Sequence, residues 1–348
     1  MKYVIKAWRD AATLIVLARQ KPVLPRRCGD TRCNYDILLQ TRTTTASSFA
    51  NGVVFPGGVS EPADDSEKWL DLIKSYGYKE EHFNNLHREK SYLVPLFQNN
   101  PIQRHISLRI TAIRETFEET GLLLCSRKKC DEKTGAWSDC IEDIDVQYWR
   151  QKISKDPAEL FNLCEKQNCY PDIWSLHYWS NWLTPATFKK RFDTAFFVVA
   201  LEEKPNSICC NSEAVVLDVT LYLNERREAR LFPPQFYELH RFKLFKNLDD
   251  LVDFASKRSG YGCLLKLNIF QWFFFISGDD LYPTELNLYD SPQKTEKSTL
   301  ELREGTHKLH RLEIIGNSSR YIFKNYSPRN HIVLQDQYLD VPVHEVFH

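Results

Sequence analysis

Three glutamates stand close together in the segment Ala112–Leu122, and their spacing restricts what this chain can form. Glu115, Glu118 and Glu119 follow the i, i+3, i+4 pattern, so a helix gathers them on one flank. Four apolar residues at helical spacing form a second face that can be buried: Ile106, Ile110, Ile113 and Phe117. Clustered carboxylates repel one another unless a cation neutralises them, and hard divalent ions prefer oxygen ligands. The segment therefore predicts either a divalent-metal site or a solvated acidic helix face, and Gly121 predicts the end of the helix.

The glycine-rich stretch Phe55-Pro56-Gly57-Gly58 favours the metal site. Together with the acidic helix it resembles the signature of the Nudix hydrolase family, Gly-x5-Glu-x7-Arg-Glu-apolar-x-Glu-Glu-x-Gly-apolar. The second half of the signature fits throughout, with a mild departure at the apolar slot: Arg114, Glu115, Thr116, Glu118, Glu119, Gly121 and Leu122. In the first half Gly58 fits, and Asp64 stands where the family usually has Glu.

An insertion splits this signature, because residues 65–113 stand where the family usually has seven. One branch of the family, the acyl-coenzyme A diphosphatases, carries such an insertion. The resemblance implies an α/β fold: a Nudix-type α/β/α sandwich with a mixed sheet in residues 1–245, interrupted by the insertion at about residues 65–103. It also implies a C-terminal α+β extension over residues 246–348.

Apolar runs predict where the strands and helices lie. Strands are expected at residues 11–18, 35–41, 122–124, 195–201, 215–221, 272–276, 309–315 and 321–323. Helices are expected at residues 69–76, 146–164 with an interruption at Pro157, 223–230, from Pro233 onward, and 248–255. The dense aromatic segment at residues 171–185 predicts core packing.

Composition excludes several classes of function. Lysine plus arginine equals aspartate plus glutamate at 46 each, so nothing indicates a broad nucleic-acid-binding or anionic-membrane surface. No apolar run reaches the roughly 20 residues that a transmembrane helix needs. The ten cysteines form no Cys-x-x-Cys pair, which favours reduced thiols over a zinc site, and none is given a role.

The family resemblance implies the chemistry of the site. Glu115, Glu118 and Glu119 would bind Mg²⁺ or Mn²⁺, which neutralises a pyrophosphate and activates water. Arg114 would hold a carboxylate of the signature, and Gly57 and Gly58 would let the backbone approach the ligand. The general base stays open between Glu119, Glu118 and a residue elsewhere. Three histidines are candidates by type alone and are expected to be structural: His177, His240 and His331.

The same resemblance implies the substrate, coenzyme A and its acyl esters, hydrolysed to adenosine 3′,5′-bisphosphate and (acyl-)4′-phosphopantetheine. Coenzyme A would need a cationic site for its 3′-phosphate, and the sequence offers Lys189, Lys190 and Arg191, with Arg191 as the substrate-binding candidate. The alternatives are a pyrophosphatase for ADP-ribose or NADH, and a non-catalytic protein that binds nucleotides or coenzyme A. A peroxisomal location follows from the family alone. The terminal residues Val346-Phe347-His348 do not match a Ser-Lys-Leu signal, so mitochondrion and cytoplasm stay open.

Overall fold

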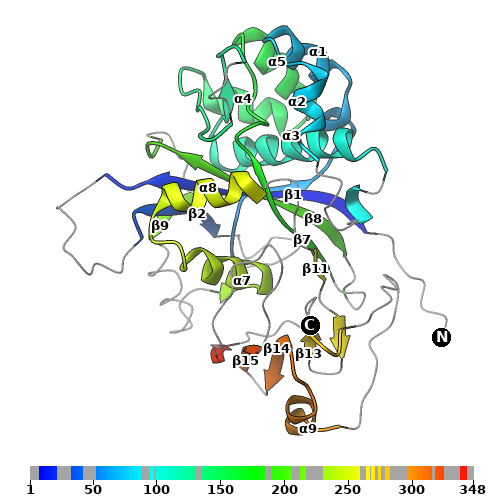
Figure 1. Ribbon diagram of the computed structural model, residues 1–348. Helices are drawn as coiled ribbons and strands as arrows, with labels where there is room; N and C mark the ends of the chain where they lie inside the picture. The colour runs from blue at the N-terminus through cyan, green and yellow to red at the C-terminus, as the bar shows by residue number, and fades with distance from the viewer. Residues whose placement is uncertain are drawn as a thin grey trace.

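A nine-stranded mixed sheet lies at the centre of the protein (Figure 1). The computed structural model describes residues 8–21, 33–41, 52–87, 95–97, 99–130, 135–184, 188, 190–205, 212–216, 230–258, 264–266, 268–270, 273–275, 279–282, 297–315, 318–324 and 338–342. The strands follow the order β10-β3-β2-β1-β8-β7-β11, with β4 paired to β1 and β9 paired to β2. Their bounds are Arg9–Arg19 (β1), Tyr35–Thr41 (β2), Gly52–Val54 (β3), Gly57–Val59 (β4), His177–Leu183 (β7), Phe192–Leu201 (β8), Ser212–Val216 (β9), Arg230–Leu231 (β10) and Leu264–Lys266 (β11).

Strand β1 is buried on both faces, which explains why its central residues are almost all apolar. It runs parallel to β8 and antiparallel to β2 and β4. Successive side chains point to opposite faces of a sheet. Leu14 and Val16 therefore join one core cluster, whereas Ile15 and Leu17 join another on the opposite face. The predicted first strand is confirmed.

Helices cover both faces, so the predicted α/β/α sandwich is confirmed. The first face carries Lys68–Ser75 (α1), Glu80–Asn84 (α2), Pro101–Thr120 (α3), Val146–Ile153 (α4) and Glu159–Lys166 (α5). Two short 3₁₀ turns, Pro62–Asp65 (η1) and Pro95–Phe97 (η2), and the small strand pair Cys125–Ser126 (β5) and Tyr170–Pro171 (β6) accompany these helices. The second face carries Pro233–Phe242 (α7) and Leu248–Arg258 (α8).

The insertion predicted at residues 65–103 forms helices that pack with α3 in one core cluster. Its first helix, α1, is the one expected from the apolar pattern, and α2 follows it. Trp69 and Ile73 of α1 and Phe83 of α2 are buried in the same core cluster as Ile113 of α3. The insertion therefore extends the first helical layer.

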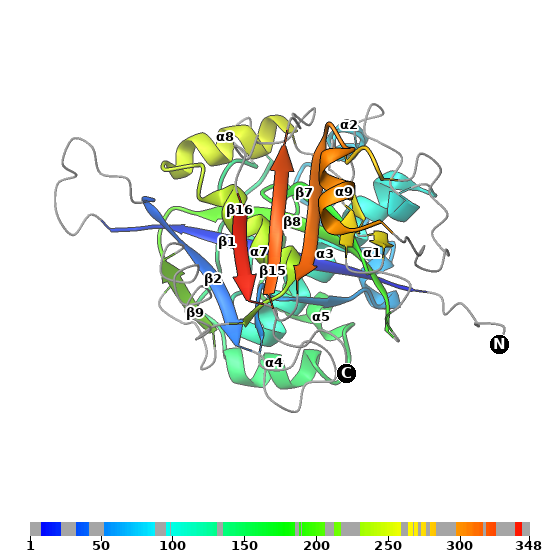
Figure 2. The same cartoon turned by 90° about the horizontal axis from the view of Figure 1, so that it is seen from below.

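A second, antiparallel sheet forms the C-terminal region (Figure 2). Its order is β12-β13-β14-β15-β16, with bounds Asn268–Phe270, Phe273–Phe275, Leu309–Ile315, Ser318–Lys324 and Tyr338–Pro342, and the helix α9 covers Thr299–Glu304. Tyr237 on α7 contacts His310 on β14 through a 3.1 Å hydrogen bond. The division into two domains at residue 245 stays a prediction. Two elements beyond that residue contact the central sheet: α8 packs on it, and β11 pairs with β7.

Some details differ from the predictions. Residues 122–124 form no strand; Leu123 makes a single bridge to Ile141, and pairing starts at Cys125. The expected helix 146–164 is two helices, α4 and α5, on either side of Pro157. Residues 223–229 of the helix expected at 223–230 lie outside the described residues, as do Lys189 and His331, and Arg230 begins strand β10 instead. None of the described helices is both long and apolar enough to cross a membrane.

Candidate active site

Helix α3 positions the acidic cluster, and its buried face is the one predicted from the sequence. Ile106, Ile110, Ile113 and Phe117 are all buried, so the opposite flank is left for the glutamates. The helix ends at Gly121, which has a left-handed φ of 80° and donates its N–H to the Phe117 carbonyl at 2.8 Å. Glycine adopts this conformation without strain. The predicted end of the helix is confirmed.

Arg114 connects the two halves of the split signature. Its Nε and Nη2 donate to the two carboxylate oxygens of Asp64 at 2.9 and 3.0 Å, and Nη2 also donates to the Val59 carbonyl at 2.8 Å. Nη1 donates to Glu118 at 2.6 Å and lies 2.9 Å from a Glu115 oxygen. Such a planar, five-donor group suits several carboxylates at once. Arg114 thus joins Asp64, from the first half of the signature, to Glu115 and Glu118 from the second half.

Strand β4 brings the backbone against the carboxylates. The Gly57 N–H donates to Glu119 at 2.9 Å, and Gln40 on β2 donates to the same oxygen. Gly58 lies directly against Glu115, because a Cβ atom added there would stand 2.4 Å from the carboxyl carbon. A larger residue at this position would push the carboxyl group out of its present place. The structure therefore brings Gly57, Gly58 and the glutamates into one place.

The electrostatics of this cluster fit a cation. Burial raises the pKa of Glu115 to about 7; Arg114 opposes this shift, and the charges of Glu118 and Glu119 add to it. The side chains of Glu115 and Glu118 keep 16% and 17% of their surface exposed. Three carboxylates are a donor set that Mg²⁺ or Mn²⁺ prefers. The residues fit a divalent cation, provided that the side chains leave their separate partners and converge on it.

A second arginine holds the end of the acidic helix, and no sequence pattern pointed to it. Arg150 on α4 donates from Nε to the Glu118 carbonyl at 2.8 Å and from Nη2 to the Glu119 carbonyl at 3.0 Å. The last carbonyls of a helix have no partner within the helix, and a cation also favours the negative end of its dipole. Because Arg150 is 31 residues away from Glu119 in the sequence, no local pattern indicates this contact.

His177 and His240, two of the three histidines considered as bases, are buried. Burial and the charge of Arg109 lower the pKa of His177 to about 4, and burial lowers the pKa of His240 to about 4. His240 Nδ1 lies 2.8 Å from the Phe236 carbonyl, one turn earlier on α7. Both rings are neutral at pH 7 and pack in the core. The base stays open between Glu118, Glu119 and a residue elsewhere.

Arg191, the predicted substrate contact, lies at the start of β8. It is buried, and its Nε donates to the Thr184 carbonyl at 3.0 Å. The guanidinium carbon lies over the Trp8 ring, 5.2 Å from the ring centre. Phe192, the residue after Arg191, pairs with Arg9 at the start of β1. Gly57 and Gly58 pair with Thr13 and Ala12, so Arg191 and the glycines lie at different positions along β1. The role of Arg191 in binding substrate stays a prediction.

The aromatic segment at residues 171–185 and the start of α7, residues 233–238, meet at one buried carboxylate. Glu238 on α7 accepts from Trp179 Nε1 at 2.7 Å, Ser180 Oγ at 2.6 Å and Trp182 Nε1 at 3.0 Å. Arg241 pairs with it at 2.8 Å, and both side chains are fully buried. The prediction that these aromatics pack in the core is confirmed, while the role of Glu238 in joining α7 to β7 was not foreseen.

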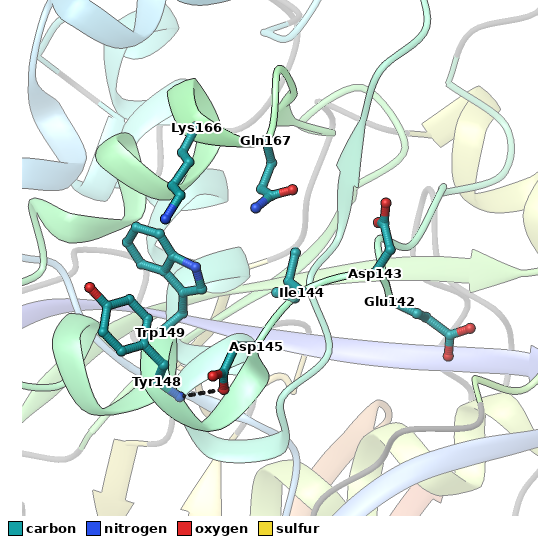
Figure 3. A pocket seen from close by; sticks show the side chains of 8 residues that line it. All are labelled: Glu142, Asp143, Ile144, Asp145, Tyr148, Trp149, Lys166 and Gln167. Carbon is teal, nitrogen blue, oxygen red and sulfur yellow. Dashed lines mark hydrogen bonds between the residues drawn. The ribbon is translucent and has the colours of Figure 1, made fainter.

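An open hollow of about 590 Å³ lies beside α4 and α5 (Figure 3). Its lining is mixed in chemistry: Glu142, Asp143, Ile144, Asp145, Tyr148, Trp149, Lys166 and Gln167. Asp145 caps α4 by accepting the Tyr148 N–H at 3.0 Å. Since no glutamate of the signature lines it, this hollow is distinct from the carboxylate cluster.

Comparison with known proteins identifies the family. The model of the NUDT19 Nudix domain matches residues 8–242. The chain is 31% identical to the acyl-coenzyme A diphosphatase NUDT19 of Xenopus laevis, over 90% of this chain and 92% of that protein. It is 30% identical to the Gallus gallus protein of the same name, over 92% of this chain and 93% of that protein.

A solved structure of a Nudix hydrolase from Alicyclobacillus acidocaldarius aligns with a TM-score of 0.48 at 18% identity, over 72% of this chain and 97% of that one. The family match covers every strand of the central sheet except β11, and it includes the glycine-rich strand β4 and the acidic helix α3. Because the family model matches residues 8–242 and the Xenopus laevis relative is 31% identical over 90% of this chain, the chain belongs to the NUDT19 family of Nudix hydrolases.

Proposed function

We propose that this hydrolase cleaves the pyrophosphate of coenzyme A and its acyl esters. The products are adenosine 3′,5′-bisphosphate and (acyl-)4′-phosphopantetheine. The observation that carries the proposal is the similarity, over about nine-tenths of each chain, to two proteins named acyl-coenzyme A diphosphatase. The complete set of signature glutamates on α3 supports turnover rather than binding alone.

Nudix hydrolases generally use divalent metals, and we propose Mg²⁺ or Mn²⁺ held by Glu115, Glu118 and Glu119. When bound, the cation supplies positive charge beside the pyrophosphate and acidifies the attacking water. Arg114 keeps Glu115 and Glu118 on one side of α3 through its contacts to both. The Gly57 N–H orients Glu119, which is a candidate to accept the proton of the water, with Glu118 as the other.

Selection among pyrophosphates must come from groups outside the carboxylate cluster, because the cluster treats any pyrophosphate alike. Coenzyme A differs from ADP-ribose in its 3′-phosphate and its pantetheine arm. One charged hydrogen bond to that phosphate contributes roughly 1.5–3 kcal/mol, about a tenfold to hundredfold preference. Lys190 is exposed and adjoins Arg191, so this pair is the first candidate for that contact.

The test is a substrate panel with the purified full-length protein. Coenzyme A, 3′-dephospho-coenzyme A, ADP-ribose and NADH are incubated with Mg²⁺ or Mn²⁺, and the products are separated by chromatography. We expect coenzyme A to be cleaved fastest, with weaker action on ADP-ribose and NADH. Faster cleavage of ADP-ribose than of coenzyme A would reject coenzyme A as the preferred substrate, while the assignment of a pyrophosphatase reaction would stand.

The Glu119→Gln variant is the control for the site. It keeps the size of the side chain and removes the charge, so we expect a loss of activity of at least about a hundredfold. Absence of turnover by the wild-type protein with either metal, together with binding of coenzyme A, would favour the non-catalytic alternative.

The peroxisomal location stays a prediction. Imaging of an N-terminally tagged full-length protein tests this location, and a diffuse signal would contradict it.

A further inference from the structure

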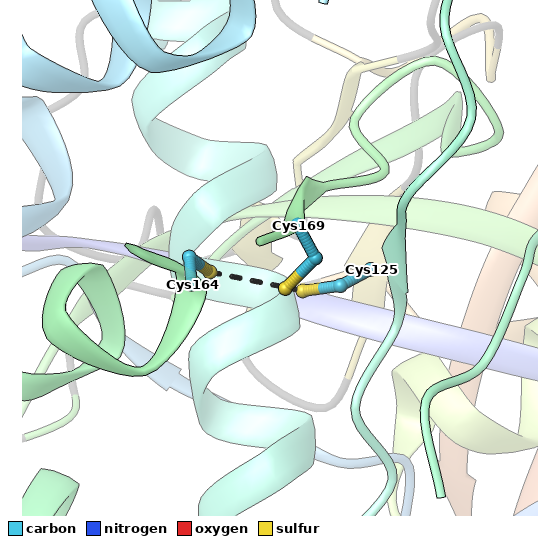
Figure 4. Close-up of side chains that lie close together, drawn as sticks. All are labelled: Cys125, Cys164 and Cys169. Carbon is cyan, nitrogen blue, oxygen red and sulfur yellow. Dashed lines mark hydrogen bonds between the residues drawn. The ribbon is translucent and has the colours of Figure 1, made fainter. Parts of the chain in front are cut away.

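Three cysteine side chains from three separate segments meet in the core of the first helical layer (Figure 4). Cys125 lies on β5, Cys164 in the last turn of α5, and Cys169 directly before β6. All three are fully buried, and their sulfur atoms all lie within 4.8 Å of one another. Among the described residues, these three form the one group of potential metal ligands that is this close.

The backbone fixes this arrangement. Asn168 has a left-handed φ of 49°, which turns the chain sharply after α5. The Cys169 N–H then donates to the Cys164 carbonyl at 3.0 Å. Pairing of β5 with β6, in the register Cys125↔Pro171, brings the third thiol to the other two. The ligand cage is therefore held by hydrogen bonds of the backbone.

The distances suit a bound cation better than a disulfide. Cys125 Sγ and Cys164 Sγ are 3.9 Å apart, whereas bonded sulfurs are about 2.05 Å apart. A metal–sulfur bond of about 2.3 Å places two ligating sulfurs roughly 3.8–4.0 Å apart in tetrahedral or trigonal geometry. Soft thiolates select Zn²⁺ and Cu⁺ over the hard ions that carboxylates bind.

We propose that Cys125, Cys164 and Cys169 form a structural site for one thiophilic cation, Zn²⁺ or Cu⁺, separate from the carboxylate cluster. The cation would fasten α5 to the β5–β6 pair. Helix α4 packs against α5, and its Arg150 holds the end of α3, so the site stiffens the support of the acidic helix. The lack of a Cys-x-x-Cys pair favoured reduced thiols over a zinc site, but one ligand of this group comes from a segment 39 positions before Cys164.

The test uses Cd²⁺ as a spectroscopic probe. Full-length protein is reduced, stripped of metal and titrated with Cd²⁺ while excess Mg²⁺ occupies the carboxylates. Cadmium bound to thiolate gives an ultraviolet charge-transfer band that carboxylates do not give. We expect one equivalent to bind, and Cys164→Ala to lose at least about a hundredfold in affinity.

Cys140→Ala is the matched control, because Cys140 is a half-buried thiol outside the group. It should bind Cd²⁺ as the wild type does. Cys169→Ser changes the volume least and replaces Cys164→Ala if that variant fails to fold by circular dichroism. Absence of the band, or a band that survives both Cys164→Ala and Cys169→Ser, overturns the proposal. Thiols that only form a disulfide, and take up no metal after reduction, overturn it as well.

Competition then separates the two cations. Zn²⁺ and Cu⁺ are each added to the Cd²⁺ form, and the ion that displaces Cd²⁺ at the lower free concentration is the preferred occupant. That ion should also raise the melting temperature of the wild type and of Cys140→Ala, but not that of Cys169→Ser. Displacement by neither ion overturns the proposal. These readouts do not depend on turnover of coenzyme A, so the site and the proposed function can fail separately.

Discussion

Arg114 and Asp64 form a buried ion pair that closes the insertion in the Nudix signature. Their exposed side-chain fractions are 3% and 1%, and two hydrogen bonds join them. Asp64 also accepts from the Glu61 N–H at 3.0 Å and from Thr111 Oγ1 at 2.8 Å. The two ends of the inserted segment therefore meet at one carboxylate, which explains how the segment fits without separating the two halves of the site.

The Asp64→Ala variant should be strongly destabilised. It leaves the Arg114 charge buried without its main partner, and breaking such a pair costs about 3–5 kcal/mol. Denaturant unfolding measures the loss, and activity should fall with it because Arg114 also positions Glu115 and Glu118. Asp65→Ala is the matched control, since Asp65 is the exposed neighbour. A free energy of unfolding within about 1 kcal/mol of wild type would contradict the role assigned to the pair.

The Gly58→Ala variant should lose activity while keeping its stability. The new methyl group would stand 2.4 Å from the Glu115 carboxyl carbon, and this flexible side chain can move away. We expect at least about a tenfold loss of kcat/KM, or about 1.4 kcal/mol.

A double-mutant cycle checks the cause of that loss. If the methyl group acts through Glu115, then Gly58→Ala adds little in a Glu115→Gln background. Equal losses in both backgrounds would show that Gly58 matters for another reason.

The sequence predicted the central fold because its signals were local. The apolar run of β1 and the helical spacing in α3 each depend on nearby residues and on which face is buried. The division of residues 146–166 into α4 and α5 was foreseen only as an interruption at Pro157. Residues 122–124 were expected to form a strand, yet three consecutive buried leucines do not specify pairing by themselves.

The site was predictable to the extent that the signature is written in consecutive residues. Glu115, Glu118 and Glu119 could be found in this way, and Asp64 by its distance from Gly58. Arg150 and Gln40 could not be found, since each reaches the glutamates from a distant segment. The cysteine group was missed for the same reason, because Cys125 is separated from Cys164 by 39 positions. Contacts between distant segments have no spacing that a sequence pattern can reveal.

Glu238 offers a third prediction, on stability. Glu238→Gln removes the charge that balances the buried Arg241. Trp179 and Trp182 donate to different oxygens of the carboxylate, so the amide NH₂ also faces one of these two N–H groups without accepting from it. We expect a loss of about 3–5 kcal/mol in the free energy of unfolding. Asp253→Asn on α8 serves as comparison, because its exposed pair with Lys257 is worth at most about 0.5 kcal/mol. Similar losses in the two variants would contradict the importance of the buried carboxylate.

Asp172 gives a prediction on pH. The residue is 4% exposed, and burial raises the pKa of its carboxyl from 3.8 to about 6 despite hydrogen bonds from neighbouring groups. The folded state therefore binds the proton more tightly than the unfolded state. The stability that this carboxyl contributes is fully present below pH 3.8 and is lost as the pH rises to about 6.

The Asp172→Asn variant should remove this pH dependence, because the amide cannot ionise and is nearly the same size. Its free energy of unfolding, relative to wild type, should rise by up to about 3 kcal/mol between pH 4 and pH 7, since one pKa unit corresponds to about 1.36 kcal/mol. Denaturant unfolding of both proteins at several pH values measures the difference, and the other titrating groups cancel because both proteins contain them. A difference that is constant across the range would show that Asp172 does not carry the shift.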